Sequence, residues 1–118
     1  MAESRLWLLY MLSGVVLLGL LGAHMFLMHL PGLLNALGVS GGEPLAFEAV
    51  ARRSQSPAWQ IYYLVFLVVA LYHGLYGLRS VLLEVFSAAK TGQHLLNLVL
   101  AAVGVLAFVY ATYVVTGF

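Results

Sequence analysis

The sequence has no cysteine and few charged residues, and each absence excludes a class of protein. Without cysteine, the chain of 118 residues forms no disulfide, no iron–sulfur cluster and no thiolate zinc site of its own. Five basic residues face four acidic ones without any basic run, so we expect no nucleic-acid binding. The sequence patterns of hydrolases, nucleotide-binding loops and zinc peptidases are missing too. We therefore expect no catalysis by this chain alone.

The sequence is instead rich in apolar residues. They make up 64% of the chain and charged residues only 8%, whereas soluble domains carry about 25% charged residues. A helix needs about 20 apolar residues to cross a bilayer, and three segments qualify, at about residues 6–30, 59–86 and 94–118. Lipid offers an open backbone no hydrogen-bond partner, so each must be helical. The sequence predicts an all-α integral membrane protein, a single transmembrane domain over residues 1–118 with three transmembrane helices.

The two connections differ in length. We expect Pro31-Gly32 to end the first helix, and within the loop 31–58 the segment after Glu43-Pro44 predicts a short interfacial helix that ends near Arg52-Arg53. The second connection, 87–92, is short and makes the second and third helices antiparallel neighbours. The third helix carries a stripe that we interpret as its packing seam: Asn97, Ala101, Gly104, Phe108 and Ala111.

The basic residues near the helix ends favour one orientation. Arg5 and Lys90 lie on one side of the membrane with Arg79 at its edge, while Arg52 and Arg53 lie on the other. Cytoplasmic ends usually carry the excess of lysine and arginine. We expect a multi-pass protein of the cell's inner (cytoplasmic) membrane with a cytoplasmic N-terminus.

His73 lies well inside the second span, where an ionisable group is costly and usually marks function. A helix places it on one stripe with Phe66, Ala70, Gly77, Ser80 and Glu84. The small residues of this stripe would leave room for a flat macrocycle ligated by the imidazole. The alternative is a packing stripe whose histidine is hydrogen-bonded to a neighbouring helix. The residues alone leave both interpretations open.

His24 lies late in the first span and cannot share an iron with His73. At 1.5 Å per residue the two imidazoles differ in depth by about 15–20 Å, whereas two axial nitrogens must lie about 2 Å from one metal. A haem at His73 would therefore need its other ligand from a second polypeptide. His24 is either the ligand of a second, outer haem or a surface histidine that reaches headgroups. His29 and His94, at span ends, are expected to be interfacial.

Two segments resemble the membrane-anchor subunits of succinate dehydrogenase. The run Tyr72-His73-Gly74-Leu75-Tyr76-Gly77-Leu78-Arg79, followed by Glu84, is similar to their second helix, which has a histidine, a glycine four residues on, an arginine and then an acid. Ser13-Gly14 and His24-Met25 fit their first helix. There are two departures: many anchors carry a His-Arg pair before the Ser-Gly, and others have a tyrosine where Val85 follows the acid here.

The resemblance implies cofactors and partners. In the family, two small anchor subunits form one helical bundle, so this chain would be half of it, and the pair docks a flavoprotein subunit and an iron–sulfur subunit. The motif histidine of such anchors ligates haem b together with a histidine of the sister subunit. Carried over, His73 is an axial ligand and His24 matches the second ligand of relatives with two haems. The haem-propionate or quinone end would comprise Arg79, Ser13, Tyr10 and Trp7.

The function that the resemblance implies is electron transfer between succinate oxidation and the quinone pool, as a subunit of the respiratory complex that also serves the tricarboxylic acid cycle. A fumarate reductase anchor performs the same transfer in the opposite direction. Two other classes stay as alternatives. One is a haem-free structural anchor in which His73 only packs. The other is a small transport subunit, against which stand the lack of a polar pathway and of a mid-span helix break.

Overall fold

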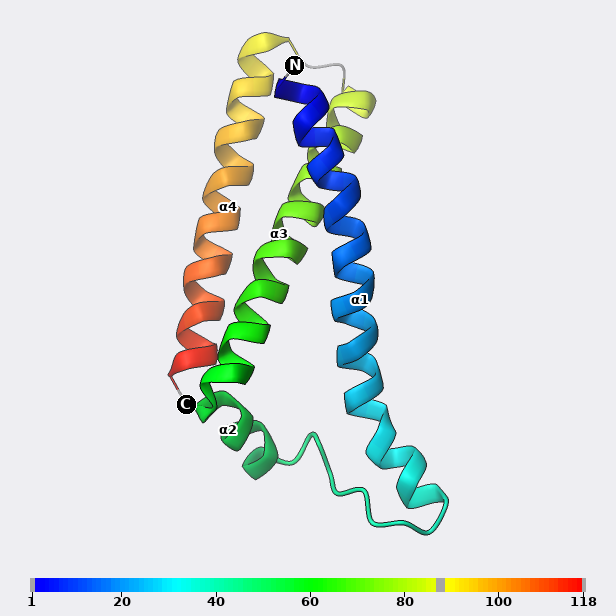
Figure 1. Ribbon diagram of the computed structural model, residues 1–118. Coiled ribbons are helices and arrows are strands. Elements are labelled where there is room, and N and C mark those ends of the chain that lie inside the picture. The colour runs from blue at the N-terminus through cyan, green and yellow to red at the C-terminus, as the bar shows by residue number, and fades with distance from the viewer. Residues whose placement is uncertain (1, 87–88, 118) are drawn as a thin grey trace.

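The computed structural model describes residues 2–86 and 89–117, which form helices and connecting loops without any strand. The helices are α1 (Ala2–Ala36), α2 (Phe47–Gln55), α3 (Pro57–Phe86) and α4 (Lys90–Thr116). Figure 1 shows α1, α3 and α4 running side by side along the long axis of the molecule, with α2 at one end. Within the described residues these three are long and apolar enough to cross a membrane. The predicted all-α fold with three transmembrane helices is confirmed.

The first span does not end where the sequence suggested. Pro31 lies inside α1, which continues to Ala36, so the expected helix end at Pro31-Gly32 is wrong. Proline removes one backbone donor but has a helical φ, so a helix can continue through it at the loss of a bond. The end is instead made by Gly38, whose φ of 81° suits the left-handed cap. There Val39 N donates to Leu34 O at 2.8 Å and closes the last turn.

The predicted short helix in the first loop is present as α2, which extends past Arg53 to Gln55. Two side chains hold this loop in shape. Arg53 donates through Nη2 to Pro44 O at 2.6 Å, and Asn35 accepts from Gly41 N at 2.8 Å while it donates to Gly42 O. These hydrogen bonds fix the connection between α1 and α2 at the end of the molecule opposite the N-terminus (Figure 1).

The last two spans lie close to their predicted bounds. α3 begins two residues earlier than expected and ends at Phe86, while α4 begins at Lys90, before the expected start at His94. Part of the predicted second loop, Ser87 and the residue after it, lies outside the described residues, as does the predicted last residue, Phe118. α3 and α4 are antiparallel, as expected from their short connection (Figure 1).

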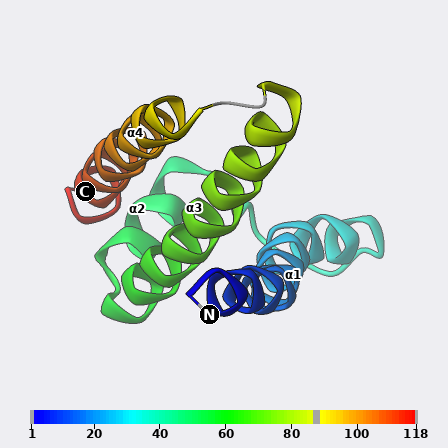
Figure 2. The ribbon, with the colours of Figure 1, turned by 90° about the horizontal axis from the view of Figure 1, so that it is seen from above.

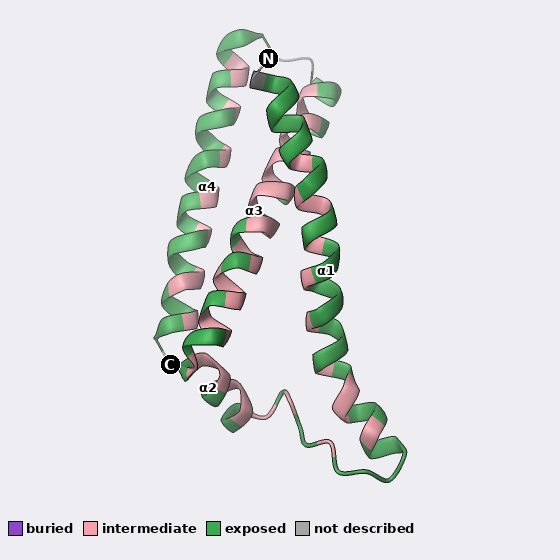
Figure 3. Cartoon of the chain, viewed as in Figure 1, coloured by how far each residue is buried: buried purple, intermediate pink, exposed green. Residues whose placement is uncertain are grey.

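α3 is the central helix of the described chain. Within the described residues, α1 and α4 both pack against α3 but not against each other. α3 therefore lies between them (Figure 2). None of the described residues is fully buried, and apolar side chains cover the outside of all three spans (Figure 3). Only lipid or further protein can cover so much apolar surface.

The face of α4 that meets α3 differs from the predicted seam. Gly104 lies on it, and a Cβ built there would come within 2.8 Å of Leu75 Cδ1, so the glycine allows the close approach. Ala111 is also half-buried, but Asn97, Ala101 and Phe108 are exposed. Asn97 still contacts α3 through Arg79, and the further half-buried positions on this face include Leu96, Leu100 and Ala107. The prediction placed the contact along the small residues of the helix. In the structure, leucine side chains pack beside a single glycine, Gly104.

Candidate functional site

The imidazole of His73 is held by the first helix. Its Nδ1 lies 3.1 Å from Ser13 Oγ and 3.3 Å from Tyr10 O, and all three residues are half-buried. Ser13 in turn donates its hydroxyl hydrogen to Tyr10 O at 2.6 Å. The packing interpretation of His73, a hydrogen bond to a neighbouring helix, thus describes one of its two nitrogens.

These contacts determine which nitrogen carries the hydrogen. A carbonyl oxygen only accepts, and the Ser13 hydrogen already points to Tyr10 O, so both oxygens near His73 Nδ1 are acceptors. With the Ser13 hydrogen directed to Tyr10 O, Nδ1 carries the ring hydrogen and Nε2 the lone pair. Among the described residues Nε2 has no hydrogen-bond partner. This is the tautomer that a metal ligand bound through Nε2 requires.

Tyr10 covers one face of this imidazole. The two rings stack at 4.5 Å between centroids with an interplanar angle of 10°, and Tyr10 also meets Tyr76 at 5.2 Å. The Tyr10 hydroxyl lies over Gly77, where a Cβ would come within 3.1 Å of it. The space that the sequence assigned to a macrocycle at Gly77 is therefore taken by Tyr10.

Gly14 likewise allows a side chain of the other helix to approach closely, here the imidazole of His73. A Cβ on Gly14 would lie 3.1 Å from His73 Cε1, so a larger residue would displace either the ring or the helix. The Ser13-Gly14 pair thus has two separate roles at one place: the serine supplies an acceptor, and the glycine lets α1 approach α3 closely.

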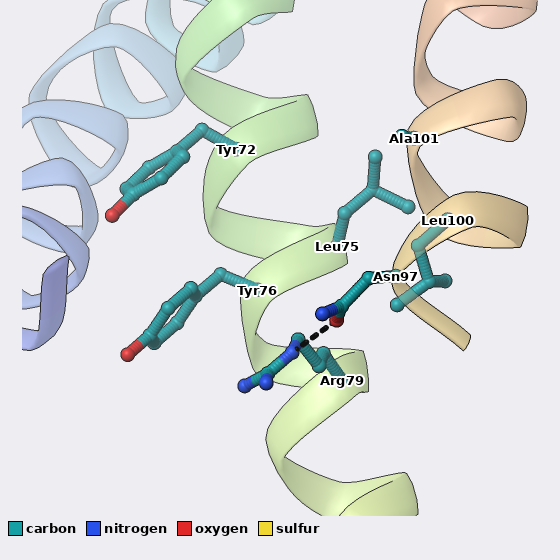
Figure 4. A pocket seen from close by; sticks show the side chains of 7 residues that line it. All are labelled: Tyr72, Leu75, Tyr76, Arg79, Asn97, Leu100 and Ala101. Atoms are coloured by element: carbon teal, nitrogen blue, oxygen red, sulfur yellow. Dashed lines mark hydrogen bonds between the residues drawn. The ribbon is translucent and has the colours of Figure 1, made fainter. Parts of the chain in front are cut away.

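Arg79 is hydrogen-bonded by a side chain of α4, and among the described residues it makes no hydrogen bond with His73. Its Nε donates to Asn97 Oδ1 at 2.6 Å (Figure 4). Two cavities of about 240 and 560 Å³ meet at Tyr76, Arg79 and Asn97. The smaller extends toward apolar side chains of α3 and α4, and the larger toward Glu3 and Leu6 near the start of α1. Arg79 thus lies where an apolar crevice meets the polar end of the bundle.

The remaining predicted residues of this end lie apart from that crevice. Trp7 is 56% exposed and Glu84 is exposed, and neither lines the two cavities. Of the predicted set, the structure brings together Tyr10, Ser13 and His73. Tyr76 connects Arg79 to them, because it touches Tyr10 and lines both cavities with Arg79.

Sequence reasoning missed Tyr72, Tyr76 and the polar role of Asn97. Tyr72 donates to Leu6 O at 2.8 Å and ties α3 to the start of α1. A signal was available, because Tyr72, Tyr76 and Arg79 recur at helical spacing on one stripe beside that of His73. Asn97 also stood out as an amide in an apolar helix, at a depth matched by Arg79 on the antiparallel neighbour.

His24 lies at a different level, about 16 Å along α1 from Ser13 at 1.5 Å per residue. Its ring meets Tyr63 edge-on and Phe66 at an angle, each at 5.9 Å between centroids. Trp59 stacks on Tyr63, which adds a third aromatic ring to the cluster. In the described part of the chain no three histidine or acidic side chains gather as a metal site. Each histidine therefore stands alone as a candidate ligand.

Comparison with known proteins agrees with a membrane-spanning anchor subunit. Residues 2–112 match the family described as "Succinate dehydrogenase/Fumarate reductase transmembrane subunit". Two proteins named "Succinate dehydrogenase hydrophobic membrane anchor subunit" are similar to the chain. The one from Thermoplasma acidophilum is 26% identical over 85% of this chain and 74% of its own length, and the one from Archaeoglobus fulgidus is 24% identical over 94% and 86%.

No solved structure matches the chain. The family match covers nearly all of the three spans, including the Ser13-Gly14 pair, His73 and Arg79. It therefore extends over every element of the site described above. The chain belongs to the succinate dehydrogenase/fumarate reductase transmembrane subunit family and is a membrane-anchor subunit of that kind.

Proposed function

We propose that this anchor binds haem b together with a sister anchor subunit and helps to form a quinone site, so that electrons pass between succinate oxidation and the quinone pool. The observation that supports this most is the state of His73. Its Nδ1 is engaged by α1, while its Nε2 keeps a lone pair without a partner among the described residues. An imidazole with one nitrogen oriented by the protein and the other open is the usual form of a metal ligand.

The residues fit a haem in two further respects. Gly14 lets α1 approach the edge of the His73 ring closely, which holds the imidazole in one orientation. The separation of His24 from His73 means that this chain supplies one axial ligand per iron, so the second ligand comes from the sister subunit. When bound, haem b supplies a one-electron carrier. The role of this chain is to hold the imidazole plane and to exclude water from it.

The quinone end is proposed at the crevice of Arg79. The Nε of Arg79 is committed to Asn97, and the rest of the guanidinium can favour the negative charge that develops on a quinone oxygen during reduction. The Tyr10 hydroxyl, which makes no hydrogen bond in the described part of the chain, is a second donor nearby. The same guanidinium would suit a haem propionate. Trp7 then serves as an interface anchor beside them.

The partners and the location follow from the same proposal. A haem-binding anchor of this family requires its sister subunit, and the pair would hold an iron–sulfur and a flavoprotein subunit at the membrane. We place the chain in the cytoplasmic membrane with its N-terminus, and hence the Arg79 crevice, at the cytoplasmic surface. Electrons would then reach quinone on the side where the iron–sulfur subunit docks. A fumarate reductase anchor would have the same parts with the opposite net direction.

A haem-free structural anchor is the second candidate. The hydrogen bonds from His73 to α1 favour it, because they already satisfy half of the imidazole without any cofactor. A second haem at His24 is a separate proposal, supported by the aromatic rings of Tyr63 and Phe66 that lie against the His24 ring.

Spectra and haem content of the purified complex test these proposals together. Replacement of His73 by alanine should remove one b-type α-band from the reduced-minus-oxidised spectrum. His24→Ala is the matched control, a histidine from another depth of the same chain. With two haems per complex, His24→Ala should remove the other band; with one haem, His24 is structural. An unchanged spectrum and midpoint potential in His73→Ala would reject haem ligation and leave the structural anchor.

A further inference from the structure

The Ser13 hydroxyl lies beside the Nδ1 nitrogen of His73. We propose that Ser13 is a positioning residue that accepts the Nδ1 hydrogen of His73, and that it thereby sets the tautomer and the electron-donating strength of the imidazole. The proposal rests on the proposed haem ligation by His73 and goes beyond it, because it removes Ser13 from the quinone donors expected from the sequence. The hydroxyl of a quinone donor must have its hydrogen free, whereas the Ser13 hydrogen is given to Tyr10 O at 2.6 Å.

The hydrogen bonds of this cluster run from the Ser13 hydroxyl to Tyr10 O and from His73 Nδ1–H to Ser13 Oγ. Tyr10 O accepts the Ser13 hydrogen, so Ser13 Oγ meets His73 Nδ1 with a lone pair, at 3.1 Å. Tyr10 O is a second and more distant acceptor for the same Nδ1–H, at 3.3 Å. Reversal of the Ser13–His73 bond would leave Tyr10 O facing a bare nitrogen lone pair. The helix α1 therefore offers Nδ1 two acceptors and no donor.

This arrangement has an electronic consequence for a ligand bound through Nε2. A hydrogen bond from the remote N–H makes an imidazole more basic, and a more basic axial ligand stabilises the oxidised metal. Loss of the Ser13 acceptor should therefore shift the midpoint potential of the haem to more positive values. Tyr10 contributes differently, since its ring is nearly parallel to that of His73 and holds the imidazole plane.

The decisive experiment compares three variants of the whole complex: Ser13→Ala, Ser13→Thr and, as a matched control, Ser80→Ala. Ser80 is half-buried near the same end and donates to Tyr76 O at 3.1 Å, but it does not touch His73. Haem midpoint potential and the low-spin electron paramagnetic resonance spectrum are measured alongside the quinone KM. Ser13→Ala should raise the potential and alter the resonance, Ser13→Thr should restore both, and Ser80→Ala should change neither. The quinone KM should stay within about twofold in all three.

Other outcomes separate the two ideas. A raised quinone KM in Ser13→Ala with an unchanged potential and resonance would return Ser13 to the quinone site and overturn the inference, while haem ligation by His73 would stand. Should Ser13→Ala lose the haem, recovery of haem in Ser13→Thr supports the inference, and no recovery overturns it. Absence of haem from the unmodified complex would reject the proposed function itself, and the inference with it.

Discussion

A half-buried imidazole inside a membrane span is costly unless its polar atoms find partners. His73 meets this cost on one side only, through the Tyr10 carbonyl and the Ser13 hydroxyl of α1. The stripe containing His73 was evident from helical spacing, and so was the choice between packing and ligation. What spacing could not supply was the direction of each hydrogen bond, because that depends on a carbonyl of another helix. The packing interpretation therefore concerns Nδ1 of His73, and the ligand interpretation concerns Nε2 of the same ring.

Arg79 gives the prediction that belongs to the residue scale. Arg79→Ala removes the charge that would favour reduction of a quinone oxygen, and a charged hydrogen bond contributes about 1.5–3 kcal/mol, equivalent to roughly a tenfold change or more. We expect kcat/KM for the quinone to fall by about tenfold, mainly through kcat, with a smaller fall in Arg79→Lys. Steady-state kinetics with a soluble quinone analogue measure the effect.

The control for Arg79 is Arg52→Ala at the opposite end of the bundle, which should leave quinone kinetics unaltered. Arg52 is exposed on α2, and its one hydrogen bond to a described residue goes to Glu48 O at 3.4 Å. If Arg79→Ala left KM, kcat and inhibitor sensitivity all at their original values, the quinone end would have to lie elsewhere.

Among the helices, α3 carries the architecture because both other spans pack on it. On α1 the half-buried positions include a stripe at helical spacing: Ser13, Leu17, Leu20, His24 and Met28. The seam of α4 was predicted less well. Small residues along one side of a helix allow close packing but do not require it at each position. Gly104 makes the close approach to Leu75, whereas Ala101 and Phe108 are exposed.

Substitutions at Gly14 and Gly22 test the packing of α1 against α3. Both lie in α1, but a Cβ at Gly14 meets His73 Cε1 at 3.1 Å, while at Gly22 nothing lies within 4 Å. Gly14→Ala should lower the free energy of unfolding by about 1–3 kcal/mol through overpacking and reduce haem retention. Gly22→Ala should be neutral or slightly stabilising, since alanine favours a helix. Thermal denaturation followed by haem absorbance measures both, and equal effects at the two glycines would contradict the described approach of α1 to α3.

The whole molecule is an open arrangement that is incomplete as a bundle. No described residue is buried, and α1 and α4 stand on either side of α3 without touching. An anchor that shares its haem with a sister subunit would have this form, because the second half of the core comes from another chain. The polar features divide between the two ends: the Arg79 crevice lies at the end with the N-terminus, and α2 with its two arginines lies at the other.

The orientation of this molecule can be tested directly, because the chain has no cysteine of its own. Glu3→Cys and Gln55→Cys each introduce one thiol at an exposed position, at opposite ends of the bundle. With a cytoplasmic N-terminus, an impermeant maleimide should label Glu3→Cys in inverted vesicles and Gln55→Cys in intact spheroplasts. The reverse pattern of labelling would place the Arg79 crevice on the outer side and contradict the proposed orientation.

The sequence by itself determined the number of spans, their helical state, the short helix before α3 and the family motif around His73. These properties follow from sums over about 20 residues in lipid or from spacing along one helix, so no distant contact is needed to predict them. Only the tertiary structure decided how far α1 continues beyond Pro31, which face of α4 packs, that Tyr10 fills the space at Gly77, and that Arg79 turns to Asn97. Each of these depends on side chains from two helices that meet in space. Helical periodicity fixes a residue's angle on its own helix but not the rotation of that helix against its neighbour.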